Sequence, residues 1–228
     1  MSPANAALPP PAREYGRGKF IALLLVVVNE AISVSMLYPY VGLLIVHLDP
    51  GMARKDAGTL SGLIVGSFNI AQAIFAQRWG RLSDTYGRRP MMVLGLIGSA
   101  VFSTLFGLSN SVWQLLVFRF LYGAANGNAP LSKTMTAEMT TSSTDAYGWA
   151  MMSAGWSIGS TIGPTFGGVL YDPSSHWPSV FAGTIFESKP ALLPGLFGAA
   201  YSIFAIGVVR FVLPESNPKA RMPLWVAR

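Results

Sequence analysis

Six long apolar runs constrain what this chain of 228 residues can fold into. A bilayer core about 30 Å thick is crossed by roughly 20 apolar helical residues, and the runs are about that long. The sequence therefore predicts an all-α fold, a polytopic membrane protein with six transmembrane helices in a domain covering residues 19–213. The runs lie at about residues 20–46, 57–78, 91–109, 112–134, 148–170 and 191–213.

The composition favours a membrane protein over a soluble domain. Hydrophobic residues make up 51% of the chain and charged residues only 11%, whereas charged residues make up about 25% of typical soluble domains. The first apolar run is longer than that of a cleaved signal peptide and no small-residue cleavage site closes it, so we expect it to be retained. The chain has no Cys, which excludes disulfides, thiolate metal ligands and Cys nucleophiles.

Lys and Arg fall on alternate sides of the predicted bundle. Cytoplasmic loops near membrane spans carry an excess of both residue types. This pattern predicts a multi-pass protein with both termini cytoplasmic, namely a tail over 1–18 and a C-terminal tail over 214–228. The first tail is Pro- and Ala-rich and is expected to be flexible. The plasma or vacuolar membrane is the expected location. The positions expected inside are Arg13, Arg17, Lys19, Arg78, Arg81, Arg88, Arg89, Arg210, Lys219, Arg221 and Arg228.

Two further expectations follow from the same distribution. The net charge of +6 reflects topology, and because no basic face carries interleaved aromatic residues, we expect no nucleic-acid partner. The segment that begins at Tyr171 carries four Pro among polar residues, and it is expected to form a long extracytoplasmic loop before the last span.

A charged motif, WGRLSDTYGRRP, joins the second and third runs. Gly80 would let a neighbouring helix come close, and Gly87 would permit a tight turn. Asp84 could accept charge-assisted hydrogen bonds from Arg88 and Arg89, or meet a helix N-terminus. A plain cytoplasmic loop would explain the Arg residues but neither the Asp nor the two Gly.

The fourth run contains Arg119, Gly123 and Gly127 at four-residue spacing, which places all three on one helix face. An Arg inside an apolar span costs at least about 2.5–3.5 kcal/mol on insertion scales, and such residues usually mark function. The alternative is an Arg whose side chain reaches the outer boundary.

The fifth run carries a stripe of Gly residues every fourth position, with a Pro and a further Gly beside it. Such a stripe allows two helix backbones to pack closely, and the Pro favours a kink. An ordinary tight helix crossing would account for two of these Gly but not for the whole series. The residues are Gly155, Gly159, Gly163, Pro164, Gly167 and Gly168.

The first run holds an acid, Glu30, eleven residues after Lys19. At about 1.5 Å per residue this is roughly 16 Å along a helix, or half the thickness of the bilayer core. Intramembrane acids commonly belong to proton relays or substrate paths. The alternative is a Glu satisfied by an Arg or by amides, with Asn29, Asn126 and Asn128 as polar neighbours.

These motifs together resemble the major facilitator superfamily. The motif at Gly80, Asp84, Gly87, Arg88 and Arg89 is similar to the signature loop between its helices two and three, and Arg119 with its two Gly resembles the helix-four motif. The Gly series resembles the helix-five motif of its antiporters. The segments GNAPLSKTMTAEMT, which contains Glu138, and LPES are similar to the drug:proton antiporter group, including its fungal zinc-induced-facilitator-like members.

The resemblance implies the N-terminal six-helix half of a fold that has two such halves, with the substrate path between them. The loop of Asp84 and the Gly face of the fifth span would then pack against the second half. The implied function is transport of a small organic molecule by proton-coupled antiport, with Glu30, Arg119 and Asn29 on the proton or substrate path. The implied partners are the bilayer, the substrate, protons and a second six-helix half.

Two alternatives stay open for such a chain. It is either one half of a transporter or a truncated, non-transporting membrane fragment or partner subunit. An enzyme is not expected, because no P-loop or HExxH motif occurs. His47 and His176 stand apart without metal-ligand spacing, so no metal and no cofactor are expected either.

Overall fold

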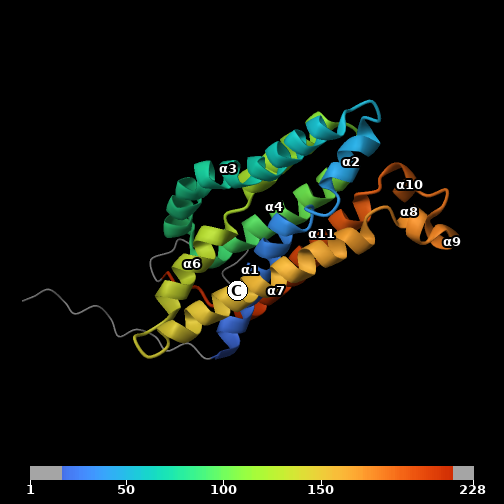
Figure 1. The fold of residues 1–228 in the computed structure, drawn as a ribbon. Coiled ribbons are helices and arrows are strands. Elements are labelled where there is room, and N and C mark those ends of the chain that lie inside the picture. Colours follow the sequence, from blue (N-terminus) through green and yellow to red (C-terminus); the bar gives the residue numbers. More distant parts are fainter. Residues whose placement is uncertain (1–16, 218–228) are drawn as a thin grey trace, which may run out of the picture.

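The structure, a computed structural model, describes residues 17–217 and is helical throughout its regular elements (Figure 1). Most of the predicted tails, 1–18 and 214–228, lies outside these residues. The helices are α1 (Arg17–Ser35), α2 (Val41–Leu48), α3 (Arg54–Tyr86), α4 (Arg88–Gly107), α5 (Val112–Ala125), α6 (Asn128–Met139), α7 (Asp145–Leu170), α8 (Pro173–His176), α9 (Pro178–Phe181), α10 (Ile185–Ser188) and α11 (Leu192–Val212).

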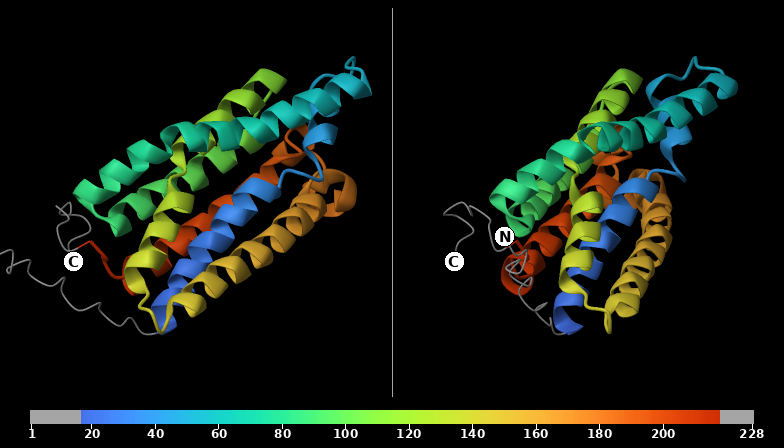
Figure 2. Two further views of the ribbon diagram at one scale, coloured as in Figure 1. Left: turned by 60° about the vertical axis from the view of Figure 1, so that its left-hand side comes forward. Right: turned by 90° about the vertical axis from the view of Figure 1, so that its left-hand side faces the viewer.

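The long helices lie side by side in a bundle. Helix α1 lies between α7 and α11, while α4 packs on the far side of α11 and α3 packs along α5 (Figure 2). Within the described residues, four helices are long and apolar enough to cross a membrane, namely α1, α3, α4 and α11. The all-α prediction is confirmed for this part of the chain, and the membrane-crossing count stands at four of the predicted six.

Two of the predicted spans are broken helices, which corrects their boundaries. The run at 20–46 divides into α1 and α2, because Pro39 in the intervening turn cannot donate a backbone hydrogen bond. The run at 112–134 divides into α5 and α6. Here the Asn126 side chain accepts a hydrogen bond from the Asn128 N–H at 3.1 Å, and this local bond competes with a continuous helix.

The Gly stripe of α7 packs against α1 of the same chain. Gly155, Gly159, Gly163 and Gly167 are all buried, and a Cβ added at Gly159 would lie 2.5 Å from the Val28 carbonyl oxygen. The face is therefore not left for a second half, which corrects that prediction. Small residues are needed here because the two backbones are in contact.

The other two residues of this motif lie off the stripe. Pro164 lies within the continuous helix α7, so the predicted kink does not interrupt it. Gly168 is exposed, and a Cβ there would approach no atom closer than the 3.7 Å to Pro39.

The segment after Tyr171 contains the three short helices α8, α9 and α10. Its first turn is held by Asp172, which has φ 51° and accepts hydrogen bonds from Ser175 and Ser174. The bond from Ser175, with that from Ser174, holds the pKa of the Asp172 carboxyl below its usual value. At the other end Lys189 donates to the Ser109 carbonyl at 3.2 Å, which ties the segment to the α4–α5 turn.

We predict that Gly159→Ala lowers the stability of the bundle by about 1–3 kcal/mol, because the new methyl group must displace the α1 backbone. The matched control is Gly62→Ala in α3, where an added Cβ meets nothing within 4 Å. Thermal melting in detergent compares the two variants. A Gly159→Ala melting temperature equal to that of Gly62→Ala would contradict backbone contact between α1 and α7.

Candidate functional site

Glu30 lies in the middle of the bundle and is almost completely buried, with 3% of its surface exposed. The Gln72 side-chain amide of α3 donates to its Oε1 at 2.6 Å. Its other oxygen, Oε2, is buried and has no hydrogen-bond partner among the residues that the structure describes. The Asn126 amide lies beside this carboxylate without forming a hydrogen bond of normal geometry.

A cavity of about 420 Å³ adjoins this carboxylate. It is formed by α1, α3, α6 and α7, and its wall combines apolar side chains with a few polar groups. Its two aromatic lining residues, Trp149 and Trp156, are exposed. The lining residues are Val27, Glu30, Val34, Asn69, Gln72, Ala129, Ser132, Lys133, Trp149, Met152, Ser153 and Trp156.

Asn29 is buried on a different side of α1 from its neighbour Glu30. Its side-chain oxygen accepts a hydrogen bond from the Ser202 hydroxyl of α11 at 2.8 Å. It does not line the cavity of Glu30. The structure thus gives Asn29 a contact that joins α1 to α11.

Arg119 is also buried, and its guanidinium binds the end of α1. It donates to the carbonyl oxygens of Ser33 at 2.8 Å and Val34 at 3.1 Å, and it lies over the ring of Phe68 at 4.3 Å from the centroid. The last carbonyls of a helix lack intrahelical partners and carry a partial negative charge, so a cation is stabilised there. The side chain therefore stays inside the bundle.

The structure does not bring Arg119 and Glu30 into direct contact. They interact electrostatically but share no hydrogen bond or ion pair. The predicted common face of Arg119, Gly123 and Gly127 is also corrected. Gly127 lies in the break after α5, where it packs against the ring of Trp79, whereas Gly123 packs against the α3 backbone at Phe68.

The charged motif is helical rather than a loop, which corrects the predicted link. Helix α3 continues to Tyr86 and α4 begins at Arg88, so Gly87 alone makes the turn, with φ 103°. This conformation favours Gly because it has no Cβ. At Gly80, an added Cβ would meet nothing within 4 Å, so the structure shows no close helix approach there.

Arg88 is the centre of an ion cluster at this end of the bundle. Its guanidinium lies 2.6 Å from Asp84 of α3 and 2.8 Å from Glu138 of α6, and it also donates to Ser83 at 2.5 Å. The cluster therefore joins α3, α4 and α6. Glu138 resembled a family acid in the sequence, and the structure shows which residue it pairs with.

A different acid, Glu215, occupies the N-terminus of α4. Its carboxylate accepts hydrogen bonds from the backbone N–H groups of Arg88 at 2.8 Å and Arg89 at 3.0 Å. Asp84 does not take this position, and the Arg89 side chain donates to the Arg210 carbonyl rather than to Asp84. The sequence signal for Glu215 was the LPES segment, whose acid follows the last helix.

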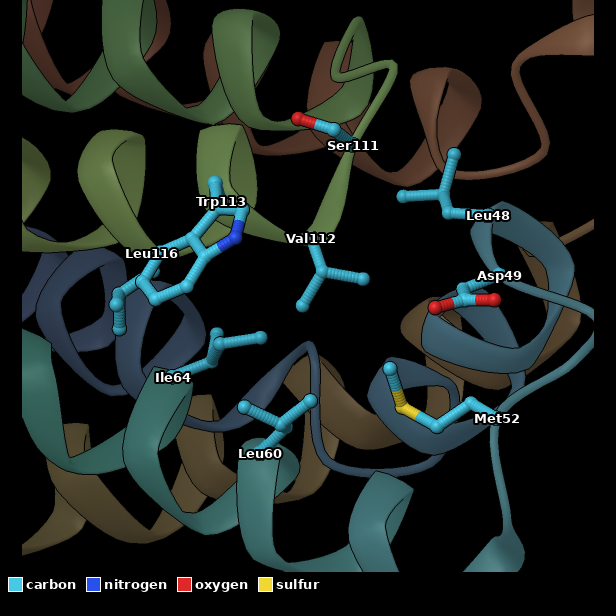
Figure 3. Close-up of a pocket in the computed structure, with 9 residues that line it drawn as sticks. All are labelled: Leu48, Asp49, Met52, Leu60, Ile64, Ser111, Val112, Trp113 and Leu116. Carbon is cyan, nitrogen blue, oxygen red and sulfur yellow. The ribbon is translucent and has the colours of Figure 1, made fainter.

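A second cavity, of about 370 Å³, lies between α2, α3 and α5, away from the end of the bundle where α3 meets α4 (Figure 3). Figure 3 shows apolar side chains around most of it, with Asp49 and Ser111 as its polar residues. It contains no buried, unpartnered polar group. The cavity beside Glu30 is therefore the better candidate for chemistry. Among the described residues, no group of three or more His, Asp or Glu could hold a metal ion.

Comparison with known proteins identifies relatives along nearly the whole chain. The profile of the Major Facilitator Superfamily matches residues 20–221. The major facilitator superfamily multidrug transporter mfsB of Aspergillus fumigatus is 33% identical over 89% of this chain and 34% of its own length. Protein ZINC INDUCED FACILITATOR 1 of Arabidopsis thaliana is 34% identical over 84% of this chain and 40% of its own length.

A solved structure has the same fold over one half of its length. The crystal structure of the human organic anion transporter MFSD10 (TETRAN) matches with a TM-score of 0.69 and 22% identity, over 92% of this chain and 50% of that one. The chain thus spans less than half the length of the two curated relatives and half of the solved chain.

We predict that Glu138→Gln lowers stability more than Asp84→Asn does. The side chain of Glu138 is 30% exposed and that of Asp84 is 65% exposed. Water can therefore replace the carboxylate as a partner of Arg88 more easily at Asp84 than at Glu138. The expected losses are roughly 1–3 kcal/mol for Glu138→Gln and about 0–1 kcal/mol for Asp84→Asn. Detergent melting curves measure both, and a larger loss for Asp84→Asn would show that the cluster is centred elsewhere.

Proposed function

The chain belongs to the Major Facilitator Superfamily, and from that membership we propose that it transports a small organic molecule across a membrane by proton-coupled antiport. The observation that carries this proposal is the buried carboxylate of Glu30, with one oxygen unpartnered among residues 17–217 and a cavity beside it. A charge in such surroundings is costly unless it is paired.

Glu30 allows a proton and a substrate to be exchanged in the cavity. Its free oxygen can be neutralised either by a proton or by a hydrogen-bonding, positively charged group of a substrate. The two cannot occupy the same oxygen together, so entry of one favours release of the other. This competition is the chemical basis of antiport, and Gln72 keeps the carboxylate in place through its bond to Oε1.

The proposed path lies between this bundle and a second six-helix unit. Trp149 and Trp156 are exposed at the cavity, and this supports the proposal that a second unit covers this face. Within this unit, we propose that six segments cross the membrane, with α1–α2 and α5–α6 each crossing as a broken helix. The other crossings are α3, α4, α7 and α11.

The remaining motif residues receive structural tasks in this proposal. Arg119 fixes the end of α1 and Asn29 fixes α1 to α11, so both hold Glu30 in position. Gly80, Asp84, Gly87, Arg88 and Arg89 form the gating region where α3 meets α4. The Gly stripe of α7 keeps α7 against α1, and Pro164 and Gly168 lie beside this stripe.

A non-transporting partner subunit is the second candidate. The two candidates differ in one observable. A transporter half binds a substrate and a proton in competition at Glu30, whereas a partner subunit needs no such competition.

We predict that both termini are cytoplasmic and that the segment after Tyr171 is extracytoplasmic. The chain lacks Cys, so single Cys residues at Ser2 and Ser174 can be labelled selectively with an impermeant maleimide in intact cells. Labelling is expected at Ser174→Cys alone, and at Ser2→Cys only after the cells are opened. Labelling of both positions in intact cells would contradict this orientation.

We predict that Glu30→Gln abolishes proton coupling, because Gln keeps the shape and a hydrogen bond but cannot carry a proton. The chain is co-expressed with a matching six-helix half and reconstituted in vesicles, and proton movement driven by 3-(2-naphthyl)alanine, whose ammonium can donate to Glu30, is followed with a pH-sensitive dye. The matched control, Glu187→Gln, changes an acid in α10 and should leave coupling intact.

The chain without the second half should give no coupled transport in the same vesicles. Full coupling in Glu30→Gln would refute the role of this acid. Full coupling by the chain alone would refute the need for a second unit.

A further inference from the structure

The break between α5 and α6 leaves a helix N-terminus in the interior of the bundle. Figure 2 shows α6 alongside α1 and α7, and α6 contacts both of these helices. The first N–H groups of a helix have no intrahelical acceptor, and they carry a partial positive charge. In apolar surroundings these donors need a partner.

The donors at the start of α6 can be assigned one by one. The N–H of Asn128 bonds the Asn126 side chain, and Leu131 already bonds the Gly127 carbonyl. Pro130 has no N–H. The N–H of Ala129 is therefore the remaining donor that has no acceptor within α6. Ala129 lines the cavity beside Glu30.

Two side chains of the next turn line the same cavity. Ser132 is 1% exposed, and its hydroxyl has no hydrogen-bond partner among the described residues. Lys133 contributes an ammonium group that forms no ion pair within residues 17–217 and acts on the Glu30 carboxylate by Coulombic attraction. A buried hydroxyl, a free N–H and a cation together suit an anion, because each can donate to a carboxylate.

We propose that the start of α6, with Ser132 and Lys133, is a carboxylate-binding subsite, and that the cavity takes organic zwitterions with an apolar aromatic body. The carboxylate of the ligand binds at α6, its ammonium binds the free oxygen of Glu30, and its body lies against Trp149 and Trp156. The subsite deepens the proposed function by naming its substrate class, and it rests on that function for the role of substrate.

The zwitterion fits the charges better than a simple anion or cation does. A simple anion would be repelled by the ionised Glu30, while a simple cation would leave Lys133 and Ser132 without an acceptor. A cavity of about 420 Å³ also has the size of ordinary small-molecule sites. In antiport, the ammonium of the zwitterion would replace the proton on Glu30.

Three probes with one aromatic body test the subsite by equilibrium binding to the purified chain in nanodiscs. They are 3-(2-naphthyl)alanine, its carboxamide, which lacks the carboxylate, and 3-(2-naphthyl)propionate, which lacks the amine. We expect the zwitterion to bind at least roughly tenfold more tightly than either analogue, since each analogue loses one charge-assisted pair.

The variants assign each charge to its residue. Lys133→Gln and Ser132→Ala should reduce the preference over the carboxamide, Lys133→Arg should restore it in part, and Glu30→Gln should reduce the preference over the propionate. Lys55→Gln and Glu187→Gln make the same chemical changes away from the cavity and should alter neither preference. Melting temperatures check that each variant is folded.

The subsite is overturned if the zwitterion and the carboxamide bind equally, if the preference survives in folded Lys133→Gln, or if none of the probes binds. Binding does not require transport, so the two proposals fail separately. Zwitterion preference without proton-coupled transport would sustain the subsite and refute antiport. Transport with equal affinity for all three probes would refute the subsite alone.

Discussion

A backbone carbonyl or N–H that loses its helical partner inside an apolar bundle is costly to leave unpaired, because the hydrocarbon core contains no water to bind it. The fold depends on how this constraint is met at its two helix breaks. At the end of α1 the guanidinium of Arg119 binds the carbonyls of Ser33 and Val34. At the end of α5 the Gln72 amide reaches the Asn126 carbonyl at 3.3 Å while holding Glu30. Polar residues in this core therefore satisfy backbone first, and the position of the acid follows from that.

The sequence was informative where a pattern has a local physical cause. The apolar runs predicted the helices, and the four-residue Gly spacing predicted a packing face on α7, because both depend on the helical period. The partner of that face was predicted wrongly, since spacing says that a helix is approached closely but not by which helix. The break at Asn126 was missed because apolar length alone does not register an Asn side chain that bonds the backbone two residues on.

The candidate site shows the same division. Burial of Glu30 could be predicted from its distance into an apolar run, but its bond to Gln72 joins residues 42 apart in sequence and has no local signal. Glu215 lies 127 residues from Arg88 and still caps its helix. Ser132 and Lys133 carried no motif, and only the break before α6 places them beside a cavity with Glu30.

The close contact of α1 and α7 has a mechanical consequence. At the four stripe positions the backbone of α7 lies against residues 24–36, so a displacement of one helix relative to the other would break this contact. We therefore expect α1 and α7 to move together as one rigid body. The cavity wall contributed by α1 and α7 keeps its shape, and any widening must come from the side of α3 and α6, where the polar groups of α6 and the amide of Gln72 stand opposite the fixed carboxylate.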